Sequence, residues 1–389
     1  MFNLTDDQRA IVDGVSAVCR SFSDEYWSAC EDEARFPAEF HKVMADGGWL
    51  GITMPEEYGG AGLGIKEAAL IMHTVASHGG GMAATSSIHM NMFGPHPMVV
   101  HGTPEQKDRW IPRLITGEDQ VCFGVTEPDA GLDTTSIKTF ARKVDGGYLV
   151  SGRKMWISTA QVASKILLLA RTSNKPSDGQ GKATAGMSLF YTDLDRSKIE
   201  VRAIPKHGRA AVDSNALFID DLFIPDEDLI GEEGRGFYYL LDGLNPERVL
   251  ISVEAIGIGQ DALRRAVKYA GERVVFGRPI GMNQGIQHPL AECWINLEAA
   301  LLMAERAVDL YDAGQPCAAE ANSAKLLGSR AGYQACHQAV LTLGGMGYSK
   351  EYQIERLMRE VLVTRIGPIT DQMILNFIGE KVLDLPKSY

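Results

Sequence analysis

The sequence of 389 residues is longer than one hydrophobic core normally supports, so two or three domains are expected. Its hydrophobic content of 45% and charged content of 23% are ordinary for a globular protein. The net charge of −12 argues against a nucleic-acid partner, because phosphate binding depends on lysine and arginine.

The six cysteines and nine histidines are dispersed, without the close Cys/His spacing that is typical of a metal site. We therefore expect reduced, mostly buried thiols and no metal. The first residues lack a basic region followed by an apolar core, and no apolar run approaches the length of a membrane span. These features predict a cytoplasmic protein with no membrane span.

Residues 1–120 predict an N-terminal helical domain. Thr5 and Thr103 are typical N-caps, and Pro104 occupies the first helical position after the second of them. Apolar residues recur at helical spacing, and a turn-rich break separates two of the helices. Helices are expected over residues 6–22 and 67–77 and from 103 onward, with the break at 54–64.

Residues 121–232 predict a central β domain, because the sequence changes to alternation and β-branched residues. Strands are expected over residues 148–150, 154–157, 165–170, 187–191 and 216–224. Residues 172–186 are rich in Ser, Lys, Gly and Pro and predict a mobile hairpin loop.

Residues 233–389 return to the helical period after an exit linker at 224–236. Long amphipathic segments are interrupted near Gly277, Pro316 and Gly344, which favours an antiparallel four-helix bundle. The helices are expected over residues 248–270, 287–311, 318–343 and 351–363.

Two Gly-x-Gly-x-x-Ala matches begin at Gly79 and Gly257. A dinucleotide-binding fingerprint needs a strand before it and a helix after it. The match at Gly257 lies inside a predicted helix and the match at Gly79 follows one, so neither predicts a Rossmann fold.

The hexapeptide Gly243–Arg248 places Glu247 in an apolar run that includes Leu240, Leu241 and Val249. Apolar surroundings disfavour the charged form of a carboxylate, which makes it competent to take a carbon-bound proton. Asn-Pro-Glu is equally typical of a helix start, with Asn as N-cap and Pro in the first position. The residues alone leave both interpretations open.

Trp156 and Ser158 end a predicted strand, where alternation places both side chains on one face. An indole beside a hydroxyl suits a flat heterocycle, although tryptophan at a strand end is also typical of core packing. The turn at Val125–Gly131 offers backbone amides and a hydroxyl to a polar ring edge, or is an ordinary β-turn.

Arg273 and Phe276 follow a predicted helix end, where arginine suits a phosphate and phenylalanine stacks on aromatic rings. A surface arginine after a helix is equally common. Gly344–Tyr348 either lets the backbone approach a ligand or forms a tight turn between helices.

In this order and spacing, the motifs resemble the acyl-CoA dehydrogenase family of flavoproteins nearly from end to end. The residues that carry the resemblance are Met54–Gly60, Gly102–Lys107, Thr126-Glu127-Pro128, Lys154–Ser158, Arg273–Ile280, Gln284, Gly344–Tyr348 and Glu355-Arg356. The resemblance implies a mainly helical α+β fold: an N-terminal helical domain, a central β domain and a C-terminal four-helix bundle.

The resemblance also implies FAD as cofactor. It implies that one group of residues surrounds the isoalloxazine, with the serine near flavin N5: Phe123, Val125, Thr126, Trp156 and Ser158. It assigns a second group to the pyrophosphate and adenine of a neighbouring subunit's FAD: Arg273, Phe276, Gln284, Gly345, Thr370 and Gln372. A shared site implies a homo-oligomer, usually a tetramer in this family.

Many members of the family carry their catalytic glutamate in a C-terminal Tyr-Glu-Gly-Thr loop, which aligns here with residues 367–370, Gly-Pro-Ile-Thr. Relatives such as isovaleryl-CoA dehydrogenase and the long-chain enzymes carry it in a Gly-Leu-x-x-Glu-Arg context, which Glu247 matches. The resemblance therefore implies that Glu247 removes the α-proton of an acyl-CoA. A hydride leaves the β-carbon for flavin N5, a trans-2-enoyl-CoA forms, and the electrons pass to an electron-transferring flavoprotein.

The resemblance places Asn245 and Arg248 near the thioester or CoA, and Gly367 beside the acyl chain, where missing bulk hints at a branched or cyclic acyl group. Pro368 stands where the family uses a backbone N–H to bind the thioester oxygen, and proline has none. Either Ile369 donates instead, or the substrate is activated differently. Leu132 and Leu341 replace residues that often contact CoA and FAD.

Three other functions remain open at this stage: an acyl-CoA oxidase, a flavin monooxygenase on the same fold, and a flavin-holding scaffold without turnover.

Overall fold

Capping threonines begin two of the N-terminal helices, which start at Asp6 and Pro104. Thr5 accepts the Gln8 N–H at the start of α1, and Thr103 accepts the Gln106 N–H at the start of α7. The computed structural model describes residues 4–174 and 182–388. Its N-terminal helices are α1 (Asp6–Arg20), α2 (Asp24–Asp32), α3 (Ala38–Asp46), α4 (Ile65–Val75), α5 (Gly81–Met92), α6 (His96–His101) and α7 (Pro104–Ile115). The predicted helices are confirmed, although α4 gives way to a π-helical turn at Ala76–Gly80.

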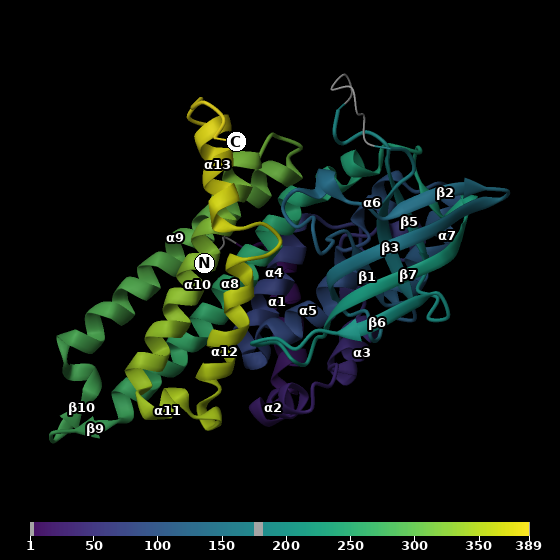
Figure 1. The fold of residues 1–389 in the computed structure, drawn as a ribbon. Helices are drawn as coiled ribbons and strands as arrows, with labels where there is room; N and C mark the ends of the chain where they lie inside the picture. Colours follow the sequence, from purple (N-terminus) through teal and green to yellow (C-terminus); the bar gives the residue numbers. More distant parts are fainter. Residues whose placement is uncertain (1–3, 175–181, 389) are drawn as a thin grey trace.

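The central domain is a sheet whose strands run in the order β6-β7-β3-β2-β4-β5-β8, with β1 parallel to β4 (Figure 1). The strands are β1 (Val121–Gly124), β2 (Phe140–Val144), β3 (Gly147–Ser158), β4 (Lys165–Arg171), β5 (Met187–Asp193), β6 (Ile199–Ala203), β7 (Ser214–Pro225) and β8 (Leu229–Ile230). Every predicted strand is present. The predicted loop at 172–186 joins the antiparallel pair β4 and β5, but residues 175–181 of it lie outside the described residues.

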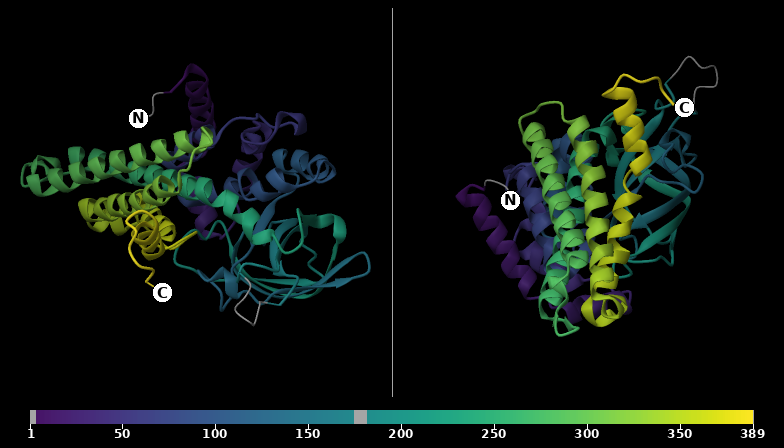
Figure 2. Two further views of the ribbon diagram at one scale, coloured as in Figure 1. Left: turned by 90° about the horizontal axis from the view of Figure 1, so that it is seen from above. Right: turned by 90° about the vertical axis from the view of Figure 1, so that its left-hand side faces the viewer.

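The C-terminal helices pack as the expected bundle, which projects away from the rest of the molecule in the view from above (Figure 2). They are α8 (Gly236–Glu272), α9 (Gln284–Asp312), α10 (Ala318–Leu343), α11 (Gly345–Tyr348), α12 (Ile354–Val361) and α13 (Asp371–Lys381). A short hairpin, β9 (Val274–Val275) and β10 (Arg278–Pro279), joins α8 to α9.

The interpretation of Asn245 as a helix N-cap is wrong, because α8 begins at Gly236 and Pro246 lies inside it. Leu240, Gly243, Pro246 and Val249 are all buried and follow one another at three-residue spacing. This continuous buried face holds the helix together through the proline, so tertiary packing outweighs the missing backbone donor.

Helix α8 joins the two helical domains. Its residues Val249, Leu250 and Val253 belong to the same apolar cluster as the N-terminal helices. Further along, a Cβ on Gly257 would lie 2.7 Å from the His73 carbonyl oxygen, and one on Gly259 would lie 2.8 Å from Gly332 Cα. The glycine pattern therefore serves close helix packing, as expected for a sequence that is not a nucleotide-binding loop.

In the described part of the chain, no helix is long and apolar enough to cross a membrane. The same residues contain no group of three or more His, Cys, Asp or Glu side chains that could hold a metal ion. All six cysteines are buried and unpaired.

Candidate active site

Glu247 on α8 faces His89 on α5. Its Oε2 lies 2.7 Å from His89 Nε2, within hydrogen-bond distance, and its side chain is 26% exposed. The expected apolar surroundings of Glu247 are therefore wrong, because an imidazole contacts the carboxylate directly. The side chain does point into the molecule, toward the N-terminal helices, rather than outward to bulk water.

A second carboxylate holds the other side of the same imidazole. Glu254 lies two helical turns beyond Glu247 on α8, so both face α5. Its Oε1 lies 2.7 Å from His89 Nδ1, within hydrogen-bond distance, and its Oε2 accepts a hydrogen bond of 3.1 Å from Thr85 Oγ1. Burial alone would lower the pKa of His89, but the charges of Glu247 and Glu254 and the hydrogen bonds to them hold the pKa well above its usual range.

Neither His89 nor Glu254 was found by the sequence analysis. The available signal was the seven-residue spacing of two glutamates within the apolar face of one helix, since a buried carboxylate needs a partner.

The end of β3 presents the residues expected around the flavin ring. Trp156 is 55% exposed at a positive φ of 62°, so its interpretation as a core residue is wrong. Ser158 ends β3 two residues later, and Phe123 lies half-buried on β1. A register shift between β3 and β7 from Lys154 to Ile157, together with the positive φ of Trp156, interrupts the alternation that predicted both side chains on one face. The end of β3 still offers an exposed indole and, two residues later, a hydroxyl, both of which suit a flat ring.

The turn after β1 is tied to β3 by a buried lysine. Lys154 Nζ donates to the Val125 carbonyl oxygen at 3.0 Å and to Glu127 Oε1 at 2.9 Å. The Met155 N–H donates to the Thr126 carbonyl oxygen at 2.9 Å. The structure therefore brings Val125 and Thr126 against the strand that ends at Trp156 and Ser158.

Arg209 is a site residue that the sequence analysis missed. Its guanidinium donates to Ser86 Oγ at 2.9 Å, Ser158 Oγ at 3.0 Å and Ser214 Oγ at 3.2 Å. Its Nε is buried and has no hydrogen-bond partner among the described residues. The guanidinium joins α5 to the end of β3 and brings positive charge to the seam between the helical and β domains. No pattern in the sequence distinguishes this arginine from a surface one.

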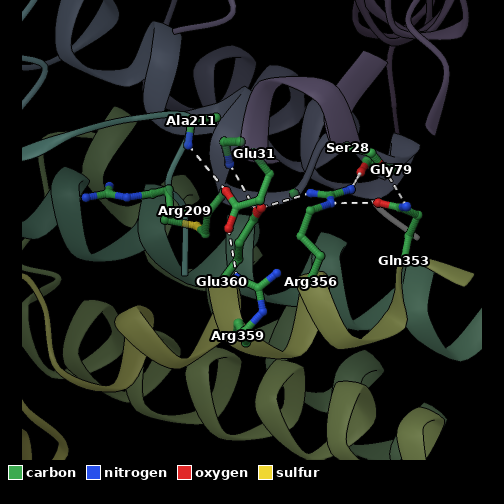
Figure 3. A network of polar contacts seen from close by, with 12 residues as sticks. Ser28, Glu31, Gly79, Arg209, Ala211, Gln353, Arg356, Arg359 and Glu360 are labelled. Carbon is green, nitrogen blue, oxygen red and sulfur yellow. Dashed lines mark hydrogen bonds and ion pairs between the residues drawn. The ribbon is translucent and has the colours of Figure 1, made fainter. Parts of the chain in front are cut away.

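A network of buried charges fixes the segment that carries Arg209 (Figure 3). Glu31 on α2 accepts the N–H groups of Ala210 at 2.6 Å and Ala211 at 3.3 Å, and its other oxygen accepts Arg359 Nη1 at 2.8 Å. Beside it, Arg356 pairs with Glu360 at 2.9 Å on α12. The loop is thereby attached to both helical domains, as a precise seam between them requires.

The hairpin residues lie elsewhere. Phe276 and Gly277 form the two-residue turn between β9 and β10, both at positive φ, and Phe276 is 101% exposed. Arg273 and Gln284 flank the hairpin and are exposed. Figure 1 shows this hairpin at the end of the bundle far from β3. The hairpin and the end of β3 therefore lie in separate parts of the chain.

The remaining predicted residues fall into two separate places. Gly345 opens α11 at the end of α10, whereas Thr370 caps α13 and precedes the exposed Gln372. Asp371 pairs with Arg330, which lies about 20 Å before the end of α10 along the helix axis. The structure does not bring Gly345 together with Thr370 and Gln372 within one chain.

Asn245 and Arg248 lie one turn apart on α8, and Arg248 Nη1 donates to Asn245 Oδ1 at 2.8 Å. Gly367 and Pro368 lie in the loop before α13, where Lys325 Nζ donates to the Ile369 carbonyl oxygen at 2.6 Å. A Cβ on Gly367 would meet only the Val363 carbonyl oxygen, at 3.9 Å. The position therefore has room beside it.

These features fit a bound flavin. Trp156 and Phe276 are large aromatic side chains that are 55% and 101% exposed. Arg209 Nε is a buried donor without an acceptor among the described residues, on the guanidinium that bonds to Ser158. An apolar surface with an unsatisfied donor at its edge suits a flat ring with polar edge atoms.

Comparisons with known proteins agree along the whole chain. Family models for the N-terminal, middle and C-terminal domains of acyl-CoA dehydrogenase match residues 5–118, 122–222 and 234–383. The acyl-CoA dehydrogenase FadE12 of Mycobacterium tuberculosis (strain ATCC 25618 / H37Rv) is 34% identical over 396 residues, which cover 99% of this chain and 98% of the relative.

Two solved structures show the same fold. A glutaryl-coenzyme A dehydrogenase in complex with glutaryl-CoA superposes with a TM-score of 0.93 at 27% identity, covering 100% of this chain and 98% of that chain. An FAD complex of PigA superposes with a TM-score of 0.92 at 26% identity, covering 98% of this chain and 99% of that chain.

Proposed function

The chain belongs to the acyl-CoA dehydrogenase family of FAD-binding oxidoreductases, and on that premise we propose that it converts an acyl-CoA thioester to a trans-2-enoyl-CoA with Glu247 as base. The observation that carries the proposal is the carboxylate of Glu247, which α8 holds half-buried beside the end of α5 with one oxygen bonded to His89. A general base must be fixed in place, and this contact restrains the carboxylate.

The chain's own residues would act on the proton and on the substrate's position. Glu247 takes the proton from the α-carbon, and its carboxylate becomes a carboxylic acid. When bound, FAD supplies the acceptor for the hydride that leaves the β-carbon. Asn245 and Arg248, joined on the same face of α8, would lie toward the thioester or CoA.

We propose that two sets of residues hold FAD. Phe123, Val125, Thr126, Trp156 and Ser158 would surround the ring, and Arg273, Phe276, Gln284, Gly345, Thr370 and Gln372 would hold its pyrophosphate and adenine. Figure 1 shows the hairpin that carries Phe276 at the end of the bundle, away from β3, which supports a site shared between subunits. We therefore propose a homo-oligomer, and specifically a tetramer.

The acyl group is proposed to be branched or cyclic. The open space beside Gly367 supports this choice, since the loop leaves room that a larger side chain would fill. The test is anaerobic bleaching of the yellow enzyme by a panel of acyl-CoA thioesters. We expect faster bleaching with branched or cyclic thioesters than with butyryl-CoA or octanoyl-CoA. Equal rates across the panel would contradict the acyl assignment, and no bleaching by any thioester would contradict the dehydrogenase itself.

We propose an electron-transferring flavoprotein as the electron acceptor and the cytoplasm as the location. The six buried, unpaired cysteines support a reducing compartment. Substrate-reduced enzyme should consume oxygen slowly and should reduce an added electron-transferring flavoprotein quickly. Rapid oxygen consumption would favour an acyl-CoA oxidase instead.

A further inference from the structure

The imidazole of His89 lies between two carboxylates of one helix, with both ring nitrogens 2.7 Å from a carboxylate oxygen. A neutral imidazole has a single N–H and could satisfy only one ionised carboxylate. Both contacts are complete when the ring is doubly protonated, or when one glutamate carries the second proton. Two ionised carboxylates and one neutral imidazole would leave one of these contacts without a hydrogen. The three side chains therefore hold one proton more than that set.

The surroundings favour placing that proton on the ring. The side chain of His89 is only 6% exposed, and that of Glu254 is fully buried. Thr85 donates to Glu254, which satisfies the second oxygen of the buried acid. Two negative charges within hydrogen-bond distance outweigh the cost of burying the imidazolium.

Other charged and titratable groups near α5 have partners of their own. Arg209 reaches the helix at Ser86. Glu360 accepts the Ala83 N–H and pairs with Arg356, and on α3 the neutral His41 faces the far end of α5 at Asn91. Glu247 and Glu254 from α8 are therefore the charged groups in direct contact with the His89 ring.

We propose that His89 is a positioning residue for the base, and that Glu254 keeps His89 in its doubly protonated form. This inference rests on the proposed function. The His89 N–H holds Glu247 Oε2, and Oε1, for which the structure gives no hydrogen-bond partner among the described residues, stays available for the α-proton. After the transfer, Oε1 carries the proton while Oε2 keeps its bond to the ring.

The proposal has a kinetic consequence that a merely structural role would not have. The His89 ring holds one oxygen of the Glu247 carboxylate in place. Without the ring, the carboxylate would lose this contact and be free to rotate. Misplacing a reacting group by about 1 Å costs on the order of 100-fold in rate. The limiting rate of flavin reduction should fall, while binding of the thioester should change little.

The test uses the FAD-loaded enzyme and the variants His89→Asn, His89→Gln and Glu254→Gln. Anaerobic stopped-flow reduction by the best thioester of the panel is measured from pH 5.5 to 9. We expect the His89 variants to lose roughly 10- to 100-fold in limiting rate, with thioester affinity changed less than about threefold. The dependence of the rate on pH should differ from that of the wild type. Glu254→Gln should produce an intermediate loss.

The matched control is His73→Asn, another histidine between α4 and α8. His73 Nε2 bonds to Gln260 Oε1 at 2.8 Å, and burial lowers its pKa to about 4. This variant therefore removes a hydrogen bond between a neutral histidine on α4 and a residue of α8, without removing a charge. Its rate profile should match that of the wild type.

FAD content and thermal midpoints are measured for every variant. If the His89 variants do not fold, Glu254→Gln, which keeps the size of the side chain, carries the test. Unchanged limiting rates and rate profiles would overturn the inference, as would a loss equal to that of His73→Asn. In both of these outcomes a thioester still reduces the wild type, so the proposed function would stand. A wild type that no thioester reduces would instead overturn the proposed function.

Discussion

Replacing Lys154 with methionine should loosen the turn that carries Val125 and Thr126. Lys154 is fully buried, and Glu127 is 6% exposed and also accepts the N–H groups of Lys138 at 2.6 Å and Thr139 at 3.0 Å. Burial lowers the pKa of Lys154 to about 8, so the lysine is still charged at pH 7. The substitution leaves Glu127 as a buried charge without its cation.

Breaking a buried ion pair by removing one partner costs about 3–5 kcal/mol. The lower end applies here, because two backbone N–H groups still bond to Glu127. A loss of about 3 kcal/mol corresponds to roughly a 100-fold change in an equilibrium constant. Spread over the unfolding entropy of a chain of this length, it lowers the thermal midpoint by about 4 °C.

The assay compares thermal midpoints and FAD retention of Lys154→Met with those of Lys143→Met. Lys143 lies on the neighbouring strand β2, and both it and its partner Asp226 are about half exposed, so its loss should shift the midpoint by less than about 1 °C. Adding Glu127→Gln to Lys154→Met should recover part of the loss, because no unpaired charge remains. Equal midpoints for Lys154→Met and Lys143→Met would refute the reasoning.

Three further outcomes are expected. Phe276→Ser should weaken both subunit assembly and FAD binding without lowering the secondary-structure content. Sedimentation at a series of concentrations measures the assembly, and an oligomeric state equal to that of the wild type would contradict this prediction. Arg209→Met should shift the midpoint potential of bound FAD to more negative values by tens of millivolts, because a buried cation favours gain of negative charge; a potential equal to that of the wild type would contradict the placement. Burial lowers the pKa of His41 to about 4. Between pH 6.5 and 4, therefore, the unfolded chain binds a proton at this histidine and the folded chain does not. The contribution of His41 to the free energy of unfolding is full above pH 6.5 and is lost as the pH falls, by up to about 1.4 kcal/mol per pH unit. His41→Asn should flatten this fall, measured as the denaturation midpoint from pH 7 to pH 5, and an equally steep fall would exclude His41 as its source.

Local chemistry was predictable because it depends on neighbours in the sequence. The caps at Thr5 and Thr103 each act on a residue three positions away, so the starts of α1 and α7 follow from the sequence. Some strands escaped prediction. β8 has only two residues, which is too short to show a period of two. β6 does alternate, with Ile199 and Val201 facing the core and Glu200 and Arg202 exposed, so this signal was present in the sequence and was overlooked.

The proposed base, Glu247, was identified through its family motif, but the residues that surround it in the fold were not predicted. His89 meets Glu247 across 158 residues and Glu254 across 165, so no local pattern connects them. The continuation of α8 through Pro246 was missed for the same reason, because the helix is held by the packing of its buried face against residues distant in the sequence. What the sequence described as an apolar carboxylate is, in the folded chain, part of a charged triad.

The most direct measurement of the central claim is anaerobic flavin reduction by Glu247→Gln, using the thioester that reduces the wild type fastest. Glu272→Gln, an exposed position at the end of the same helix, is the matched control. The variant should keep its FAD and thermal midpoint but lose on the order of 100- to 10,000-fold in reduction rate, as expected when a general base is removed. Bleaching at the wild-type rate would show that another group removes the proton.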